Sequence, residues 1–301
     1  MIKTVLGDIP ENSLGITLSH EHICNYCEYL RMMAGEKYLD TKLLIDTAVE
    51  YLKFLKNEYG LASIIDCSTV NIGRNIDILK EVSERAEINI VCSTGFYYTN
   101  EPVMAAMSAE SIGEIISVDA ERINAGVIKC AVEDSEINGF TGKLLIASAI
   151  SQKATGLPII MHTNANNQNG IKALKILIEA GANPKSVTVG HLSDTDDLEY
   201  IEKIASFGCY IGYDRLYDNH GDEYINKTVN AIKQLCAGGF ENQLLLSHDA
   251  TFFSGFDAVP KIIEKPRFNY CFEHILPKLP KELADIIMIE NPAQMLSNRE
   301  E

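Results

Sequence analysis

The chain has 301 residues, which is long for one ordinary domain but suits a single α/β barrel of roughly 250 residues with extensions. It carries 26 Lys and Arg against 42 Asp and Glu, a formal net charge of −16, which disfavours a nucleic-acid binder and a protein that docks on anionic membranes. Hydrophobic residues make up 46% and charged residues 23%, which excludes a disordered or fibrous chain.

The sequence also gives expectations about location. Its start lacks the apolar core of a signal peptide, and no stretch approaches the roughly 18 consecutive apolar residues of a membrane span. Eight cysteines are spread along the chain, and the single C-x-x-C at Cys24 and Cys27 has no second pair to complete a structural zinc site. We therefore expect reduced thiols and a cytoplasmic protein.

Short apolar runs rich in β-branched residues alternate with helical patterns along the whole chain. Eight strands are predicted in this way, over residues 15–22, 62–69, 89–96, 126–133, 158–165, 187–193, 209–214 and 242–249. Strands that alternate with helices are typical of βαβ units and a parallel sheet. Because no linker divides the chain, the expected fold is α/β, a (β/α)8 TIM barrel that forms a single domain over residues 1–301.

Helical segments are expected between the strands. Apolar residues near i, i+4 spacing predict an amphipathic helix over residues 41–55. The run Thr195-Asp196-Asp197 supplies a cap and an acidic first turn for a helix after the sixth strand. After the eighth strand, residues 257–280 form an insert whose four prolines predict loops around one short helix.

Side chains that bind metals stand at the ends of five predicted strands. They are His20 and His22 on the first, Lys129 on the fourth, His162 on the fifth, His191 on the sixth and Asp249 on the eighth. Catalytic groups of such barrels lie at the carboxyl ends of the strands, and residues two apart point to the same face. A lone histidine there is more often a hydrogen-bonded core residue, but four of the chain's seven histidines share this placement.

Lys129 lies inside the apolar run Val127 to Val132, where a charged amine is costly unless it is paired or neutralised. An ammonium group has no lone pair for a metal. Reaction of the neutral amine with carbon dioxide gives a carbamate, a carboxylate on a long stem that can bridge two cations.

These residues and their surroundings resemble the amidohydrolase superfamily, and within it the phosphotriesterase family. The matching stretches are 18–22, 73–75, 93–97, 125–129, 189–194, 247–249 and 290–293. The resemblance implies two divalent metal ions. His20, His22 and Asp249 would hold the more buried ion, His162 and His191 the more exposed one, and carbamylated Lys129 with a hydroxide would bridge them. Zinc suits these ligands best, with manganese, cobalt or iron as other occupants.

The resemblance also implies roles around the metals. Asp249 would take the proton of the attacking water, and Asp194 would relay it outward. Arg215, at the end of the seventh strand, replaces the histidine of organophosphate-degrading members and looks like the lactonase branch. Tyr97 matches a tyrosine that contacts the substrate. The plainer alternatives are an ion pair of Arg215 with Asp194 or Asp214 and packing of Tyr97 at the barrel rim.

Three further residues in the insert suggest a clamp for a phosphate at the far end of the substrate. Arg267, Tyr270 and Lys265 combine two cations with a hydroxyl, although a solvated loop explains them equally well. The expected function is therefore hydrolysis of a lactone, a sugar lactone with or without a phosphate. A phosphotriesterase (aryldialkylphosphatase) or phosphodiesterase, and a degenerate barrel that binds a metabolite or partner, are the alternatives. The expected partner is a small lactone or ester, not a nucleic acid or membrane, and the family allows a homodimer.

Overall fold

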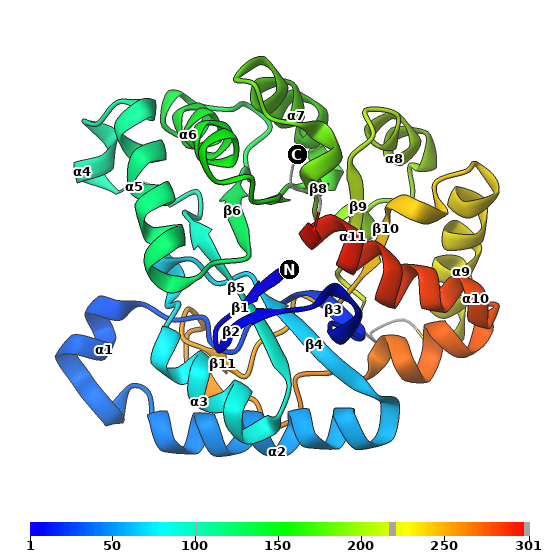
Figure 1. Cartoon of the computed structure of the whole chain (residues 1–301), viewed down its shortest axis with the longest axis horizontal. Helices are drawn as coiled ribbons and strands as arrows, with labels where there is room; N and C mark the ends of the chain where they lie inside the picture. Colours follow the sequence, from blue (N-terminus) through cyan, green and yellow to red (C-terminus); the bar gives the residue numbers. More distant parts are fainter. Residues whose placement is uncertain (100, 217–220, 298–301) are drawn as a thin grey trace.

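The computed structural model describes residues 1–99, 101–216 and 221–297, and it is built around a sheet of eight parallel strands (Figure 1). These strands are β3 (Ile16–Glu21), β4 (Leu61–Asp66), β5 (Asn89–Gly95), β6 (Val127–Ala131), β7 (Ile159–His162), β8 (Val187–Val189), β9 (Tyr210–Tyr213) and β10 (Leu244–Leu246). Each strand pairs with the next in chain order, and each overlaps one predicted range. The eight predicted strands are therefore confirmed.

The first and last strands of the sheet meet through serine side chains. The Ser19 hydroxyl donates to the carbonyl oxygen of Leu246 over 3.2 Å, and the backbone N–H of His20 donates to the Ser247 hydroxyl over 2.9 Å. These contacts nearly close the sheet between β3 and β10 without a regular ladder. The predicted TIM-barrel fold is confirmed.

Helices fill the intervals between strands and lie outside the barrel (Figure 1). They are α1 (Glu28–Ala34), α2 (Thr41–Tyr59), α3 (Ile76–Ala86), α4 (Pro102–Ala105), α5 (Ala109–Ile123), α6 (Gly139–Thr155), α7 (Asn169–Glu179), α8 (Leu198–Ala205), α9 (Gly221–Ala237), α10 (Lys281–Asp285) and α11 (Asn291–Ser297). The helix predicted over residues 41–55 is confirmed as α2 and continues to Tyr59. Asp197 caps α8, as predicted, by accepting from the backbone N–H of Tyr200. In the part of the chain that the structure describes, no helix has the length and apolar character needed to cross a bilayer.

A small hairpin and the last helix cover the end of the barrel where the strands begin. The hairpin pairs β1 (Ile2–Thr4) with β2 (Gly7–Ile9), and Figure 1 shows it near α11. Ile2 and Met295 are buried in one cluster with apolar residues of the strands. This end of the barrel is therefore a packed core.

The inward face of the strands changes character along their length. Val127 on β6 and Ile160 on β7 belong to the apolar cluster at the barrel floor. Two residues further on, period-two geometry gives the same inward direction to Lys129 and His162. A polar layer thus lies directly above the apolar plug, toward the carboxyl ends of the strands.

The segment after β10 differs from the predicted insert over residues 257–280. It begins with a second hairpin, β11 (Phe253–Ser254) with β12 (Lys261–Ile262), and continues into a π-helical turn (Cys271–Ile275) and a 3₁₀ turn (Leu276–Lys278). The short helical segment was predicted, but the hairpin was not. Strands of two residues are too short to show alternating hydrophobicity.

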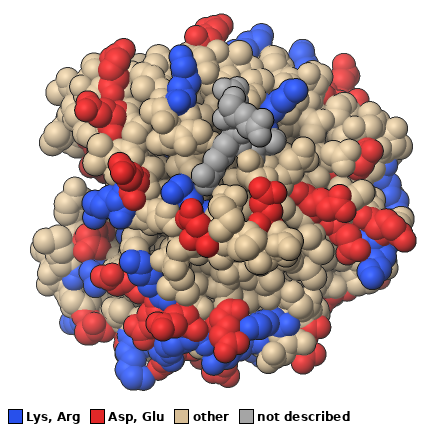
Figure 2. All heavy atoms as spheres, in the orientation of Figure 1, with Lys and Arg blue, Asp and Glu red and all other residues tan. Residues whose placement is uncertain are grey.

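Charged side chains of both signs share the face drawn in Figure 2. Acidic and basic groups lie close together along the edge formed by α2. Arg85 of α3, for example, reaches Asp46 of α2 at 2.6 Å and Glu81 at 2.9 Å. On this face the acidic side chains therefore lie among basic ones and do not form a single acidic patch.

Candidate metal centre and active site

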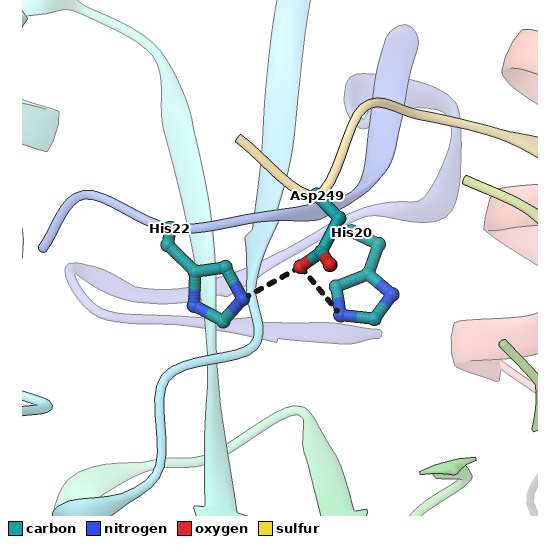
Figure 3. Close-up of side chains that lie close together, drawn as sticks. All are labelled: His20, His22 and Asp249. Atoms are coloured by element: carbon teal, nitrogen blue, oxygen red, sulfur yellow. Dashed lines mark hydrogen bonds and ion pairs between the residues drawn. The ribbon is translucent and has the colours of Figure 1, made fainter. Parts of the chain in front are cut away.

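The first group of predicted ligands converges on the carboxylate of Asp249. Oδ1 of Asp249 lies 3.1 Å from Nε2 of His22 and 3.6 Å from Nε2 of His20, and Figure 3 shows it between the two imidazoles. His20 belongs to β3, while Asp249 follows β10, so the near closure of the sheet brings them together. These three side chains could hold a metal ion.

The second group consists of His162 and His191, which end or follow neighbouring strands. Nδ1 of His162 lies 2.7 Å from Nε2 of His191. The other nitrogen of each ring faces a carboxylate: Glu133 is 2.8 Å from Nε2 of His162, and Asp214 is 3.0 Å from Nδ1 of His191. Each carboxylate accepts the ring N–H, so the two facing nitrogens both carry lone pairs. A divalent cation shared by the two lone pairs removes their repulsion.

The pKa values of these histidines also favour metal binding. Burial lowers the pKa of His162 to about 4 and that of His191 to about 3. Burial also lowers the pKa of His20. All three rings are therefore neutral near pH 7, as metal ligation requires. The donor set of imidazole nitrogens and a carboxylate suits a divalent cation.

Lys129 contacts the first group and lines the same cavity as His162. Its Nζ lies 2.6 Å from Nε2 of His20, and its side chain is buried. The neighbouring strand β5 approaches the backbone of Lys129 closely. A Cβ on Gly95 would lie 2.1 Å from the carbonyl oxygen of Lys129, and Gly95 has a φ of 96°. The structure thus brings together all six predicted metal-ligating residues, and it explains why glycine stands at position 95.

Two of the six ligands have unusual backbone conformations. His191 has a φ of 65° and Asp249 a φ of 51°, in the left-handed region that costs non-glycine residues of the order of 1–3 kcal/mol. Hydrogen bonds hold both: the N–H of His191 donates to Asp214 over 2.7 Å, and the N–H of Asp249 donates to the carbonyl of His20 over 3.0 Å. Such strain is concentrated at functional sites.

Asp214 fixes the two metal groups relative to each other. Its Oδ2 accepts from Nδ1 of His20 over 2.6 Å, while its Oδ1 accepts from His191. Burial opposes ionisation of Asp214, but the two histidines hold its pKa well below the ordinary range. The carboxylate therefore stays charged and leaves Nε2 of both rings free for a metal. The sequence indicated Asp214 only as an ion-pair partner for Arg215.

Arg215 instead bridges two other carboxylates. Its Nε donates to Oδ2 of Asp249 over 2.9 Å, and its Nη1 donates to Asp194 over 2.8 Å. Of the two predicted ion-pair alternatives, the one with Asp194 is therefore present. Burial raises the pKa of Asp194 against the opposing effect of Arg215. Arg215 thus links Asp249 and Asp194, the two carboxylates predicted to take and relay the proton.

A cavity of about 430 Å³ opens above these residues. It is lined by His20, His22, Asn25, Ile72, Tyr97, Tyr98, Thr99, Lys129, His162, Arg215, Asp249 and Phe256. The hydroxyl of Tyr97 lies 3.4 Å from Nδ1 of His162, and burial raises its pKa, so it remains a neutral donor. Tyr97 therefore points into the site rather than serving only to pack the barrel rim.

Comparison with known proteins shows which family the chain belongs to. The model of the phosphotriesterase family matches residues 1–296. The chain belongs to the phosphotriesterase family. It is 29% identical to the aryldialkylphosphatase of Saccharolobus solfataricus, over 96% of this chain and 97% of that protein. It is 28% identical to the phosphotriesterase homology protein of Mycobacterium tuberculosis (99% and 98%) and 26% identical to the N-acetyltaurine hydrolase of Homo sapiens (98% and 97%).

Comparison with a solved structure agrees with this family membership. The structure of the phosphotriesterase from Mycobacterium tuberculosis matches with a TM-score of 0.88 at 26% identity, covering 98% of both chains. The predicted membership is confirmed, and the chain is a phosphotriesterase-family hydrolase. Its His and Asp groups could bind the metal that a binuclear hydrolase of this family requires.

One residue of this phosphotriesterase-family site was missed from the sequence. Glu133 follows β6 and accepts from His162 through one oxygen and from Nδ2 of Asn164, at 2.8 Å, through the other. The hydrogen bond with His162 is the main reason that the pKa of Glu133 falls to about 2. Its position at the end of the fourth predicted strand, residues 126–133, was the available signal, because strand ends were where the other site residues were predicted.

The predicted phosphate clamp is not part of the site. Lys265 and Arg267 are exposed and line a separate cavity of about 740 Å³ beside α2, together with Glu50, Glu264 and Glu273. Tyr270 is buried, with its ring 4.7 Å from that of His274. None of the three lines the cavity above the metal ligands. The chain after β12 runs outward over α2, and this path removes Lys265, Arg267 and Tyr270 from the candidate substrate contacts.

Proposed function

We propose that this phosphotriesterase-family hydrolase is a lactonase, which opens a small cyclic ester by attack of a metal-activated water. The observation that carries the proposal is Arg215, which stands where organophosphate-degrading relatives are expected to have histidine. No phosphate is included in the proposed substrate, because Lys265 and Arg267 lie outside the cavity.

The metal centre supplies the nucleophile in this proposal. His20, His22 and Asp249 would hold one ion, and His162 and His191 the other. Divalent cations bound by these residues would supply a water of lowered pKa and a Lewis acid for the ester carbonyl. Zinc suits the nitrogen and oxygen donors best.

Lys129 would bridge the two ions as a carbamate. The amine and carbon dioxide combine with release of one proton, and the resulting carboxylate oxygens can face both ligand groups. Its burial and its 2.6 Å contact with His20 support this role. A charged amine in this position would oppose the binding of two cations.

Asp249, Arg215 and Asp194 would handle the proton. Asp249 accepts it from the attacking water, since its carboxylate faces both ligand groups. The guanidinium of Arg215 cannot accept a proton near neutral pH, so its role is to fix both carboxylates by charge-assisted hydrogen bonds. Asp194 lies on the outer side of Arg215 and provides the next carboxylate toward solvent.

The cavity would hold the ring of the substrate. Tyr97 offers a hydroxyl beside His162, and Ile72 and Phe256 add apolar surface. A planar ester carbonyl can reach the more exposed metal position while the ring contacts these side chains.

A substrate panel tests the proposal. The metal-loaded protein is assayed against γ- and δ-lactones, paraoxon and N-acetyltaurine, the last two chosen from the named activities of its relatives. The expected result is a kcat/KM for at least one lactone at least about a hundredfold above that for paraoxon. A preference for paraoxon or for the amide would overturn the lactonase proposal.

A further inference from the structure

Glu21 is a buried acid that stands between two candidate metal ligands on β3, His20 and His22. Neighbouring residues of a strand point to opposite faces, so the side chain of Glu21 faces away from the side on which both imidazoles lie. A carboxylate buried away from water is unfavourable unless several donors satisfy it. The partners of Glu21 therefore indicate its role.

Four hydrogen bonds reach Glu21, and all come from the segment after β10 that carries Asp249. Its Oε1 accepts from the Ser247 hydroxyl over 2.7 Å, from the backbone N–H of His248 over 3.0 Å and from Nδ1 of His248 over 2.7 Å. Its Oε2 accepts from the backbone N–H of Ala250 over 3.0 Å. One side chain thus binds the residues on both sides of Asp249.

Further contacts fix the direction of these hydrogen bonds. The Ser247 hydroxyl already accepts from the backbone N–H of His20 over 2.9 Å, so its own O–H donates to Glu21. Nε2 of His248 accepts from the backbone N–H of Cys271 over 3.1 Å, so Nδ1 is the donor nitrogen of this ring. The carboxylate of Glu21 is therefore the acceptor at every one of its contacts with the segment.

These hydrogen bonds act where the backbone is strained. Asp249 has a φ of 51°, and left-handed residues allow nearby N–H groups to converge on one anion. Here that anion is the carboxylate of Glu21. In this conformation Oδ1 of Asp249 lies 3.1 Å from Nε2 of His22 and 3.6 Å from Nε2 of His20 (Figure 3). A change of φ at Asp249 would move the carboxylate relative to both imidazoles.

We propose that Glu21 is a positioning residue, which sets the carboxylate of Asp249 for the metal ion that His20 and His22 would share with it. The inference rests on the metal centre of the proposed function, and it adds a residue that acts through Asp249 without being a ligand. Residues that orient metal ligands typically contribute about 10- to 100-fold to metal affinity. Loss of Glu21 should therefore weaken metal binding even though every ligand is still present.

Two variants of Glu21 and one control test the proposal. Glu21→Gln keeps an amide oxygen for the donors at Oε1 but presents an N–H group to Ala250, while Glu21→Ala removes all four contacts. The control is Asn291→Ala. Asn291 is also buried, and its Nδ2 donates to the carbonyls of Glu241 over 2.8 Å and Leu244 over 2.7 Å. The control thus loosens the beginning of β10, whereas the Glu21 variants loosen the segment after its end.

Chelator competition, starting from the zinc-loaded proteins, measures the affinity for zinc. It should fall about tenfold in Glu21→Gln and about a hundredfold in Glu21→Ala. Urea unfolding measures stability in parallel. Asn291→Ala should lower the unfolding midpoint but change zinc affinity less than about twofold, because its contacts lie far along β10 from Asp249. Wild-type affinity in both Glu21 variants, or an equal fall in affinity in Asn291→Ala, would overturn the proposal.

A double-mutant cycle tests whether Glu21 acts through Asp249. In an Asp249→Ala background the carboxylate to be positioned is absent, so adding Glu21→Gln should change zinc affinity less than about twofold. An undiminished effect in this background would mean that Glu21 acts on the metal site by another route, and the proposal would be wrong.

Zinc is the only ligand in these measurements, so the result does not depend on the substrate. If no lactone is hydrolysed but Glu21→Gln still weakens zinc binding, the lactonase proposal fails and the role of Glu21 stands. If a lactone is hydrolysed and Glu21→Gln binds zinc as tightly as wild type, the role of Glu21 fails and the lactonase proposal stands.

Discussion

The carboxylate of Glu133 lies 2.8 Å from Nε2 of His162, while Nδ1 of the same ring faces His191 at 2.7 Å. Glu133 therefore decides which nitrogen of His162 carries the proton. Replacing it with Ala removes this control, and we expect the affinity for the more weakly held metal ion to fall about 10- to 100-fold. Metal titration with an indicator chelator measures the change.

Glu136→Ala is the matched control for Glu133→Ala. Glu136 lies in the same loop but is exposed, and its carboxylate reaches only Lys172, at 3.4 Å. Its replacement should leave metal affinity unchanged. Equal affinity in wild type and Glu133→Ala would show that the hydrogen bond does not orient the ligand.

Lys129 offers a direct test of the proposed carbamate. Lys129→Ala should lose both metals together, because its buried side chain contacts one ligand group and lies beside the other. Elemental analysis of purified protein should give near two metal equivalents for wild type and well below one for the variant. Labelling with ¹³C carbon dioxide should add a carbamate resonance in wild type alone. Full metal content and activity in Lys129→Ala would refute the bridge.

Because Arg215 bridges two carboxylates, we expect its replacement by Lys to lower activity less than its replacement by Ala. Arg215→Lys keeps the charge but cannot bond Asp249 and Asp194 through two fixed N–H groups, whereas Arg215→Ala removes both contacts. We expect kcat/KM for the preferred lactone to fall about tenfold in the first and at least a hundredfold in the second. Loss of the cation also raises the pKa of Asp194, so the acidic limb of the pH profile should move to higher pH in Arg215→Ala. A similar rate and profile in all three proteins would contradict this role.

The buried histidines make the stability of the metal-free protein depend on pH. The pKa of His162 is about 4 in the folded state against an ordinary value near 6.5, so between these values the unfolded chain binds more protons. Stability is therefore fully present above about pH 6.5 and falls as the pH drops toward 4, by up to about 1.4 kcal/mol per pH unit for this group. Urea unfolding of chelator-treated protein between pH 5 and 8 measures the slope. His162→Asn should have a smaller slope, and an equal slope would assign the effect to other groups.

The positions of the candidate metal ligands could be predicted because they depend on regular geometry. A residue at the end of a parallel strand lies at the barrel mouth, and period-two alternation sets its inward direction. His20, Lys129 and His162 needed nothing further than these two rules. Arg215 and Tyr97 were predicted from the family resemblance, and both line the same cavity.

The residues that were missed or misplaced depend on irregular backbone. Asp214 contacts both His20 and His191, and His191 has a left-handed φ of 65°. Lys265 and Arg267 were placed at the mouth on their charge alone, but the β11–β12 hairpin and the left-handed Arg267 direct that segment toward α2. The left-handed conformations of His191 and Arg267 do not follow from a local sequence pattern, because tertiary contacts hold them.

The close approach of β5 and β6 gives a prediction about stability. Gly95 combines a φ of 96° with a position where any Cβ would lie 2.1 Å from the carbonyl oxygen of Lys129. Gly95→Ala must therefore push β5 away from β6, the strand that carries Lys129, and we expect a loss of at least about 3 kcal/mol in unfolding free energy with reduced metal content. Gly7→Ala is the control, since Gly7 has a φ of 120° but nothing within 4 Å of the added Cβ, so it reports the backbone cost alone, about 1 kcal/mol. Denaturant unfolding of both variants measures the difference, and equal losses would mean that the contact with Lys129 relaxes without cost.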